Sequence, residues 1–426
     1  MGRSKTIGAV ALGIAVFTTA LAACAPGTGQ GGGGGSADKK LTYVYFTDGP
    51  DQQATRSLIS KFEKQTGATV DLQIVPYSDL EQQLQARLSG GNAPDVARLV
   101  NLTPFRSDLL DVKKYGHDMA AEFLDPTRPA VTGKGGELLG LPSDLTMNGP
   151  FVNTDQFAKA GVALPPGDRP WSWDEMVTAA KKVQQANHTE FAIAYDKSGH
   201  RFGGMLSQFG TQYFTADAGV DLDPGKATAA VGLFTDLTKQ DVMPKDLWLE
   251  SGTKYKAASD VFLAQAAPVY FSGNWQVSQF AKAAKFGWAA IANPCQAQCG
   301  GYPGGKFMVA FKKSKNPQLA ADFLAFMNSA ESQREFCQTS LFLPTRKDLV
   351  ASGVNYPQRT EDMAVFLSDV ARTPAVAYAN NYNPAFNGIA QATTKELAAT
   401  IAGKQSAEVA VQHMRDAAAK NLQDVK

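Results

Sequence analysis

The sequence predicts an α/β fold with two lobes, and three features of the chain support this prediction. Its 426 residues exceed the length that a single hydrophobic core usually serves. Residues 41–100 alternate between strand and helix patterns, which is typical of a mostly parallel sheet flanked by helices. Residues 139–150 are apolar but are interrupted by Pro142, Gly149 and Pro150, which indicates an extended segment that crosses a boundary.

The N-terminal elements follow from local patterns. Residues 41–47 alternate and are rich in Tyr, Val and Phe, which favours a strand. Further strands are expected at 69–75 and 94–100, with helices at 51–65 and from Ser78, as its cap, to the closing Gly90-Gly91 pair. Ligands of parallel sheets bind beyond the carboxyl ends of the strands, so Asp48 and Asn101 should lie at the mouth of the first lobe.

Cap residues predict the elements that follow. Asn153 opens a short helix that stops at Gly161. Ser172 and Glu175 form a capping box ahead of the next helix. The remaining expected elements are helices at 226–240, 258–266 and 404–424 (capped by Ser406), and strands at 267–271 and 286–292.

The first 38 residues predict a targeting signal and a tether. Arg3 and Lys5 precede an apolar stretch at 7–20 that is too short for a comfortable membrane span. The stretch ends in Leu-Ala-Ala-Cys at 21–24, which matches the bacterial lipoprotein cleavage box. We therefore predict a signal peptide at 1–23, lipidation of Cys24 and a Gly-rich flexible tether at 24–38. The alternative is an ordinary secreted leader in which Cys24 is incidental.

Charge and motif content exclude several classes of function. The chain has 41 basic and 40 acidic side chains, and without Arg3 and Lys5 the balance is 39 against 40, or −1. This balance gives no reason to expect nucleic acid or a membrane surface as the partner. Gly-x-Ser-x-Gly and His-Glu-x-x-His are both absent, so the sequence offers no hydrolase or zinc-protease signature. We expect no cofactor and no metal site.

Three cysteines remain beyond the leader. Cys295 and Cys299 lie in Pro-Cys-Gln-Ala-Gln-Cys-Gly, and an exported protein can oxidise such a pair. We predict a disulfide between them. Cys337 lies near Phe336 and Leu341 and is expected to be a buried thiol.

Several motifs, taken together and in order, resemble those of one family. Gly140-Leu141-Pro142 precedes Val-Asn-Thr-Asp-Gln-Phe-Ala-Lys-Ala-Gly at 152–161, and Trp-Ser-Trp-Asp-Glu follows at 171–175. Asn-Pro-x-x-Ala-x-x-Phe-Leu-x-Phe at 316–326 and Leu-Pro-Thr at 343–345 continue the series. The order resembles that of extracellular solute-binding proteins of carbohydrate ABC importers, the family that includes the maltose-binding protein. It covers nearly the whole chain, although Val152 stands where the family has Tyr and Ser172 where it has Thr.

The resemblance implies a fold and a mechanism. Lobe 1 would comprise 39–145 and 293–343, and lobe 2 would comprise 146–292 and 344–426. The crossovers near 142–150, 290–300 and 341–347 would act as the hinge. A mono- or oligosaccharide would bind between the lobes and favour the closed form. A monomer anchored in the cell membrane at Cys24, on the extracytoplasmic face, would then deliver the ligand to a permease that works with a cytoplasmic ATPase.

Candidate ligand contacts are of two kinds. Aromatic rings cover the apolar faces of a sugar, while charged and amide groups bind its hydroxyls. The stacking candidates are Trp275 in a Gly-x-Trp turn, Phe202 among glycines, Tyr382 and Tyr302. The polar candidates are Asp48, Asn101, Asp144 and Arg201. For each candidate, a structural role is the alternative to ligand contact: a ring in the core, a cap of a turn, a structural bond at the hinge or a charge on the surface.

Three other functions stay open on sequence alone. The same fold could bind a polyol, a glycerophosphodiester or another sugar derivative, and Arg98 and Arg201 in the cleft would favour an anionic ligand. A surface-anchored glycosidase would need paired carboxylates, for which Asp48, Asp95 and Asp144 are candidates. An adhesive surface protein would need no small ligand.

Overall fold

The computed structural model describes residues 39–166, 169–217, 219–250 and 254–425. The predicted signal peptide at 1–23, the lipidation of Cys24 and the tether at 24–38 lie outside these described residues. Residues 39–426 form a single compact unit by their contacts.

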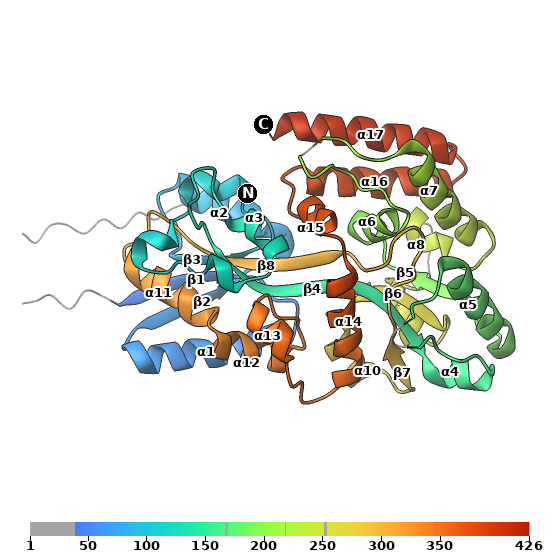
Figure 1. The fold of residues 1–426 in the computed structure, drawn as a ribbon, viewed down its shortest axis with the longest axis horizontal. Coiled ribbons are helices and arrows are strands. Elements are labelled where there is room, and N and C mark those ends of the chain that lie inside the picture. The colour runs from blue at the N-terminus through green and yellow to red at the C-terminus, as the bar shows by residue number, and fades with distance from the viewer. Residues whose placement is uncertain (1–38, 167–168, 218, 251–253, 426) are drawn as a thin grey trace, which may run out of the picture. The chain divides into compact units, whose positions relative to one another are not determined.

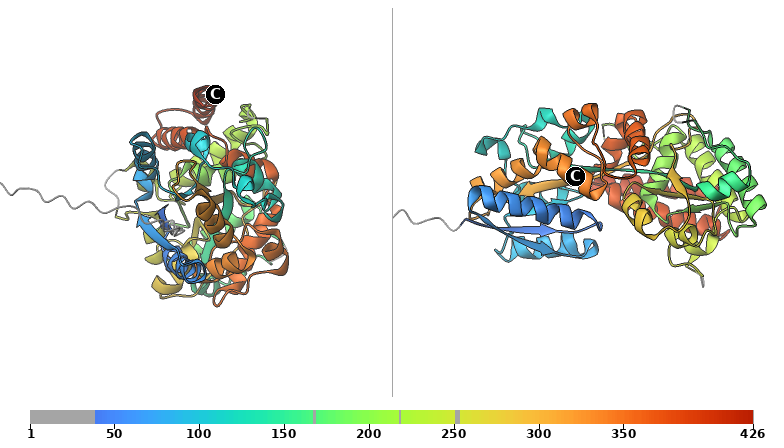
Figure 2. Two further views of the ribbon diagram at one scale, coloured as in Figure 1. Left: turned by 90° about the vertical axis from the view of Figure 1, so that its left-hand side faces the viewer. Right: turned by 90° about the horizontal axis from the view of Figure 1, so that it is seen from below.

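The first elements match the predicted order. Strands β1 (Lys40–Tyr45), β2 (Thr69–Ile74) and β3 (Val96–Leu99) alternate with helices α1 (Asp51–Thr66) and α2 (Tyr77–Ser89). β1 pairs in parallel with both β2 and β3, and α1 lies alongside them (Figure 2). α2 begins one residue before Ser78, behind Pro76, so Ser78 is not the cap that the sequence predicted. Short helices follow: η1 (Thr103–Asp108), η2 (Val112–Tyr115), η3 (Ala120–Glu122), η4 (Asp125–Thr127) and α3 (Arg128–Val131).

Two strands extend the sheet beyond this group and connect it to a second one. β4 (Leu141–Asn153) and β8 (Pro303–Ala310) run antiparallel along the middle of Figure 1. The strand order is β2-β1-β3-β8-β4-β6-β5, and β7 also pairs with β4. Every antiparallel pair involves β4 or β8, whereas β1–β2, β1–β3 and β5–β6 are parallel. The α/β fold class is confirmed.

The second group lies around the far end of β4. Its strands are β5 (Ile193–Tyr195), β6 (Val269–Gly273) and β7 (Trp288–Ala290). Its helices are α4 (Thr154–Lys159), α5 (Trp173–Asn187), α6 (Gly199–Gln208), α7 (Pro224–Lys239), α8 (Lys245–Leu249), α9 (Ala258–Leu263) and α10 (Gln276–Ala283). The capping box of Ser172 and Glu175 is present at the start of α5, as predicted.

The C-terminal third is helical. It contains α11 (Pro317–Met327), α12 (Ala330–Ser340), α13 (Lys347–Ser352), α14 (Thr360–Arg372), α15 (Ala375–Asn381), α16 (Phe386–Ile401) and α17 (Ala407–Asp424). Ser406 caps α17 as predicted. In Figure 1 α16 and α17 lie side by side and, with α7, form one layer.

The three predicted crossovers are bonded to one another. The backbones of Leu145 and Leu343 form an isolated bridge. The Asn293 amide donates to the carbonyl oxygen of Asn148 at 2.8 Å. Bending about these segments stays a prediction, as do the lobe boundaries. Arg346 and Lys347 form ion pairs with Glu122 and Asp125, which favours a second boundary later than residue 344.

Two further features of the described residues bear on function. None of their helices combines the length and the apolar character needed to cross a membrane. They also contain no cluster of His, Cys, Asp and Glu that could hold a metal ion.

Candidate functional site

A cavity of about 580 Å³ lies where loops of both strand groups meet. From the first group, Asp48 follows β1 and Asn101 follows β3, so the polar residues expected at the sheet edge line one wall. From the second group, Arg201 lies in the first turn of α6 and Trp275 follows β6. The structure thus gathers four of the eight predicted contact residues around one cavity. Their contact with a ligand stays a prediction.

The carboxylate of Asp48 is held by two cations. Lys306 on β8 lies 2.6 Å from it, and the guanidinium of Arg98 lies 3.7 Å away. Burial alone would raise the pKa of Asp48, but the charges of Lys306 and Arg98 outweigh it and lower that pKa below its ordinary value. Asp48 therefore stays ionised at neutral pH and presents acceptor oxygens to the cavity.

Arg98 is buried beneath the cavity and is neutralised by other carboxylates. Its guanidinium lies 3.0 Å from Asp51 and 2.9 Å from Asp144, and both carboxylates are fully buried. Asp144 also lies 3.6 Å from Lys306. A buried cation with this many partners costs far less than an unpaired one.

A chain of contacts holds the indole of Trp275. Nε2 of His200 lies 3.0 Å from the carbonyl oxygen of Pro303, which can only accept, so Nε2 carries the proton. Nδ1 then accepts from the guanidinium of Arg201 at 2.8 Å. Burial and the charge of Arg201 lower the pKa of His200 to about 3, so the imidazole is neutral. The same guanidinium lies 4.1 Å from the centre of the Trp275 ring.

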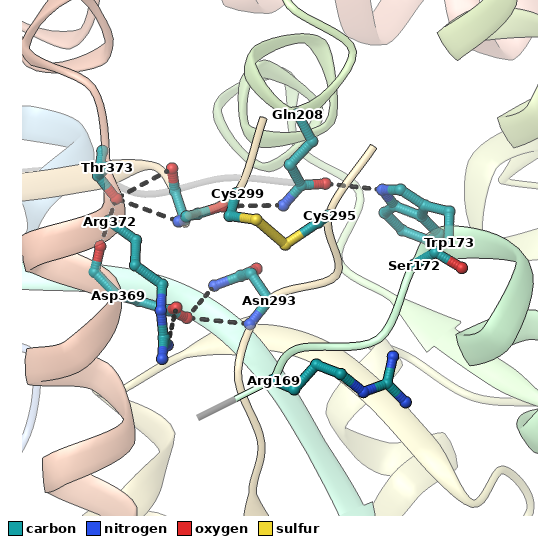
Figure 3. Close-up of a disulfide and its surroundings, with 12 residues drawn as sticks. Arg169, Ser172, Trp173, Gln208, Asn293, Cys295, Cys299, Asp369, Arg372 and Thr373 are labelled. Atoms are coloured by element: carbon teal, nitrogen blue, oxygen red, sulfur yellow. Dashed lines mark hydrogen bonds and ion pairs between the residues drawn. A yellow bond between two sulfur atoms is a disulfide. The ribbon is translucent and has the colours of Figure 1, made fainter. Parts of the chain in front are cut away.

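The disulfide predicted between Cys295 and Cys299 is present (Figure 3). Cys337 is a buried free thiol, as expected. The disulfide loop supports the elements behind the cavity. The backbone of Cys295 accepts from Trp173 N–H at 3.1 Å, and Gln208 on α6 bonds both Trp173 Nε1 and the Gly300 carbonyl. Neither cysteine lines the cavity.

Comparison with known proteins decides the family. A model described as bacterial extracellular solute-binding protein matches residues 57–365, which is more than half of the chain. This chain belongs to that family. This chain is 25% identical to a binding protein of Brucella abortus over 376 residues, which is 83% of this chain and 85% of the relative. It is 23% identical to the arabinooligosaccharide-binding protein of Bacillus subtilis over 74% of this chain and 76% of the relative.

Solved structures of similar proteins share the fold. The GacH receptor of Streptomyces glaucescens, solved unliganded and with acarbose, superposes with a TM-score of 0.73 at 19% identity, over 90% of this chain and 99% of that one. Maltose-bound MalE3 of T. maritima gives a TM-score of 0.73 at 20% identity, over 91% and 100%. At this identity the likeness shows the fold alone.

Four predicted contact residues of the solute-binding protein do not line the cavity. Asp144 is the buried ion-pair partner of Arg98. This is a structural bond of the kind that was the alternative to ligand contact for this residue. Phe202 is fully buried against Phe234. Successive helix residues point about 100° apart, so α6 turns Phe202 into the core when it directs Arg201 to the cavity.

The two tyrosines, Tyr302 and Tyr382, do not line this cavity either. Tyr302 is fully buried and stacks on Phe386 with ring centres 5.9 Å apart. Tyr382 packs edge-on against Phe307, and its neighbours Asn381 and Asn383 line the cavity instead. Both rings therefore pack against other aromatic rings of the protein.

Several residues that line the cavity were not among the contacts predicted from the sequence. The most prominent is Tyr77, the first residue of α2, which is 56% exposed. The others are mainly amides, hydroxyls and cations: Thr146, Lys197, Ser198, His200, Lys306, Asn381, Asn383, Asn387, Gln391 and Thr394. The three asparagines at 380, 381 and 383 were a signal in the sequence, whereas α16 carries its polar residues among alanines and gives little indication of the site.

Proposed function

We propose that this protein is the substrate-binding lipoprotein of an ABC importer that captures a mono- or oligosaccharide between its two strand groups and delivers it to a membrane permease. The observation that carries the proposal is the character of the cavity. Its wall combines one ionised carboxylate, several amides, hydroxyls and cations, and the aromatic rings of Tyr77, Trp275 and Phe386. Such groups match the hydroxyl rim and the apolar C–H faces of a sugar.

The pairing of charges favours a neutral ligand over an anionic one. Lys306 and Arg98 are engaged by Asp48, Asp51 and Asp144. Arg201 lies 3.7 Å from Asp196, and Lys197 lies 2.6 Å from Glu250. An anionic ligand would have to compete with these carboxylates for the cations. The cavity therefore favours a neutral sugar or a polyol over a glycerophosphodiester as the ligand.

Glycoside hydrolysis is disfavoured by the number of carboxylates. Both common mechanisms need a pair that flanks the scissile bond. Asp48 is the only carboxylate that lines this cavity among the described residues. Asp95 is bonded to the Thr42 backbone and to Ser314, and Asp144 is paired with Arg98. We therefore propose binding without chemistry on the ligand.

The names of relatives support the class of ligand. Proteins named for arabinooligosaccharide binding come from Halalkalibacterium halodurans and Bacillus subtilis, at 24% and 23% identity. The lipid anchor at Cys24, the monomeric state and the docking on permease subunits extend the proposal from the sequence motifs at 21–24 and the family membership.

Calorimetric titration of the leaderless protein tests the proposal. The panel should contain neutral mono- and oligosaccharides, polyols, glycerophosphodiesters and uronic acids. We expect saturable heat with at least one neutral saccharide and a matching rise in melting temperature. Binding of glycerophosphodiesters alone would favour the anionic alternative, and release of new reducing ends would establish the glycosidase. Flat heats across the panel would contradict saccharide binding.

A further inference from the structure

A small cavity of about 10 Å³ adjoins the central one, and Arg201 lines both. Its other walls include Asn148 of β4, Ser272 of β6 and Asn293 in the second predicted crossover. All three of these side chains are buried. The small cavity therefore lies between a residue of the candidate ligand site and two of the three segments that are expected to act as the hinge.

Three polar side-chain atoms of these walls have no hydrogen-bond partner among the residues that the structure describes. Nε of Arg201 is buried and lies 3.7 Å from the carboxylate of Asp196, which is too far for a hydrogen bond. Asn148 accepts a backbone N–H through its side-chain oxygen, but its amide nitrogen has no acceptor in the described part of the chain. Asn293 donates to Asn148 and Asp369 (Figure 3), but its side-chain oxygen has no donor within the same residues.

A water molecule has the size and the hydrogen-bonding pattern that these atoms require. A site for one water needs about 10–15 Å³ of room and two to four polar partners. The water would accept from Nε of Arg201 and from the amide of Asn148, and would donate to the oxygen of Asn293. Its second proton would go to the hydroxyl of Ser272, whose own proton is donated to Asp196 at 2.7 Å.

The same groups argue against an ion. A metal cation such as Ca²⁺ or Mg²⁺ takes oxygen ligands, whereas Arg201 and Asn148 present N–H donors. A chloride ion accepts hydrogen bonds but donates none, so it would face the oxygen of Asn293 with no proton between them. We propose that the small cavity binds one water molecule, which links Arg201 in the candidate ligand site to Asn148 and Asn293 in the hinge segments.

The water gives Arg201 a fixed place relative to two crossovers. The guanidinium of Arg201 lines the central cavity and lies 4.1 Å from the centre of the Trp275 ring. Its Nε–H is held, through the water, by Asn148 and Asn293, which makes these two asparagines positioning residues for the ligand site. The water site itself is independent of the ligand, and only the effect of this positioning on binding rests on the proposed function.

A crystal structure of the leaderless protein at atomic resolution tests the water site without any ligand. We expect one fully occupied solvent peak within hydrogen-bond distance of Nε of Arg201, Nδ2 of Asn148 and Oδ1 of Asn293. The absence of a peak would overturn the inference. A second crystal soaked in bromide tests for an anion, because an anomalous signal at the peak would show a halide and overturn the assignment to water.

Gly204→Ala tests the positioning role. Gly204 lines the small cavity, and a Cβ there would fall 2.7 Å from Nδ2 of Asn148, so the methyl group takes the space of the water. Ala suits the interior of α6, and we expect a folded protein without the solvent peak and with a displaced Arg201 side chain. An Arg201 side chain that keeps its position without the water would overturn the positioning role.

Calorimetry with maltose and arabinotriose measures the effect of this displacement on binding. We expect Gly204→Ala to weaken binding about tenfold, which corresponds to the loss of a hydrogen bond to a charged group. Gly232→Ala is the matched control, because nothing lies within 4 Å of a Cβ there. Wild-type affinity in Gly204→Ala would overturn the positioning role. Flat heats with both sugars in the wild-type protein would count against the proposed function, whereas the crystal structures would still decide the inference.

The double variant Gly204→Ala/Arg201→Lys separates loss of the water from general damage to the hinge. Lysine keeps the positive charge but has no N–H group at the position of Nε. If the water acts through Arg201, adding Gly204→Ala to Arg201→Lys should change affinity by less than about twofold, because the two effects are not additive. An equal loss from Gly204→Ala in both backgrounds would show that the methyl group acts on the hinge by another route and would overturn the positioning role.

Discussion

Gly273 lies so close to Trp275 that a Cβ atom at residue 273 would fall 1.9 Å from the indole ring. The indole is therefore packed against bare backbone at the end of β6, while the guanidinium of Arg201 covers it from 4.1 Å. The position of this ring in the cavity wall depends on the absence of a side chain at 273.

Gly273→Ala should therefore reduce ligand binding. The added methyl forces the indole away from its position, and overpacking of this kind costs about 1–3 kcal/mol. We expect a loss of affinity of about tenfold and a shifted tryptophan emission maximum, both measured by fluorescence titration. Gly232→Ala is the matched control, because nothing lies within 4 Å of a Cβ there and Ala suits the interior of α7. Wild-type affinity in Gly273→Ala would contradict the role given to Trp275.

Asp48→Asn should weaken binding without unfolding the protein. The change keeps the shape but removes the charge that strengthens hydrogen bonds from ligand hydroxyls, worth about 1.5–3 kcal/mol for a charged acceptor. We expect a 10- to 100-fold loss of affinity by calorimetry. Asp174→Asn, in the exposed first turn of α5, should leave affinity unchanged.

The same carboxylate predicts a pH dependence. Lys306 and Arg98 lower the pKa of Asp48 despite its burial, so ionisation and the stability that it brings are present at neutral pH. Both are lost only as pH falls through that lowered pKa. Affinity of the wild-type protein should thus be flat from about pH 5 to 8. A steep fall of affinity between pH 7 and 5 would show that another group controls binding.

The sequence predicted the first strand group well because its signals are local. Alternation in 41–47 and the glycine after α1 are each decided by neighbouring residues, and both elements formed as expected. The incorrect predictions of site residues arose from contacts between segments that are distant in the sequence. Nothing near Asp144 in the sequence reveals that Arg98 of β3 lies beneath it, and the glycines around Phe202 do not reveal which way α6 is turned. Tyr77 was missed because its exposure depends on what packs beside α2.

The disulfide should contribute to stability more than to binding. In the loop-entropy description, a bridge between cysteines four residues apart restrains the unfolded chain by about 2 kcal/mol. We expect Cys295→Ser/Cys299→Ser to lose about this much free energy of unfolding in urea titration, with ligand affinity within a fewfold of wild type because neither residue lines the cavity. A large loss of affinity with unchanged stability would contradict this separation.

The hinge region contains a buried carboxylate that should make stability depend on pH. Asp369 on α14 accepts from the backbone N–H of Asn293 at 3.0 Å and from its side-chain amide at 2.7 Å (Figure 3). Asn293 in turn bonds Asn148 of β4, so this carboxylate ties α14 to two of the three crossovers. Burial raises the pKa of Asp369 to about 6, although the bonds from Asn293 and Arg372 oppose the rise.

The direction of the pH effect follows from this raised pKa. Between about pH 4 and 6 the folded protein holds a proton at Asp369 that the unfolded chain has released, so the stability contributed by this group falls as pH rises through that window. A rise of about two pKa units corresponds to about 3 kcal/mol. Asp369→Asn removes the titration, so the difference in unfolding free energy between wild type and variant should change by about that amount from pH 4 to pH 7, measured by urea titration. Asp362, whose pKa burial also raises, is present in both proteins and cancels in the difference. Asp174→Asn should give a constant difference across the same range, and a constant difference for Asp369→Asn would show that the carboxylate is ionised throughout.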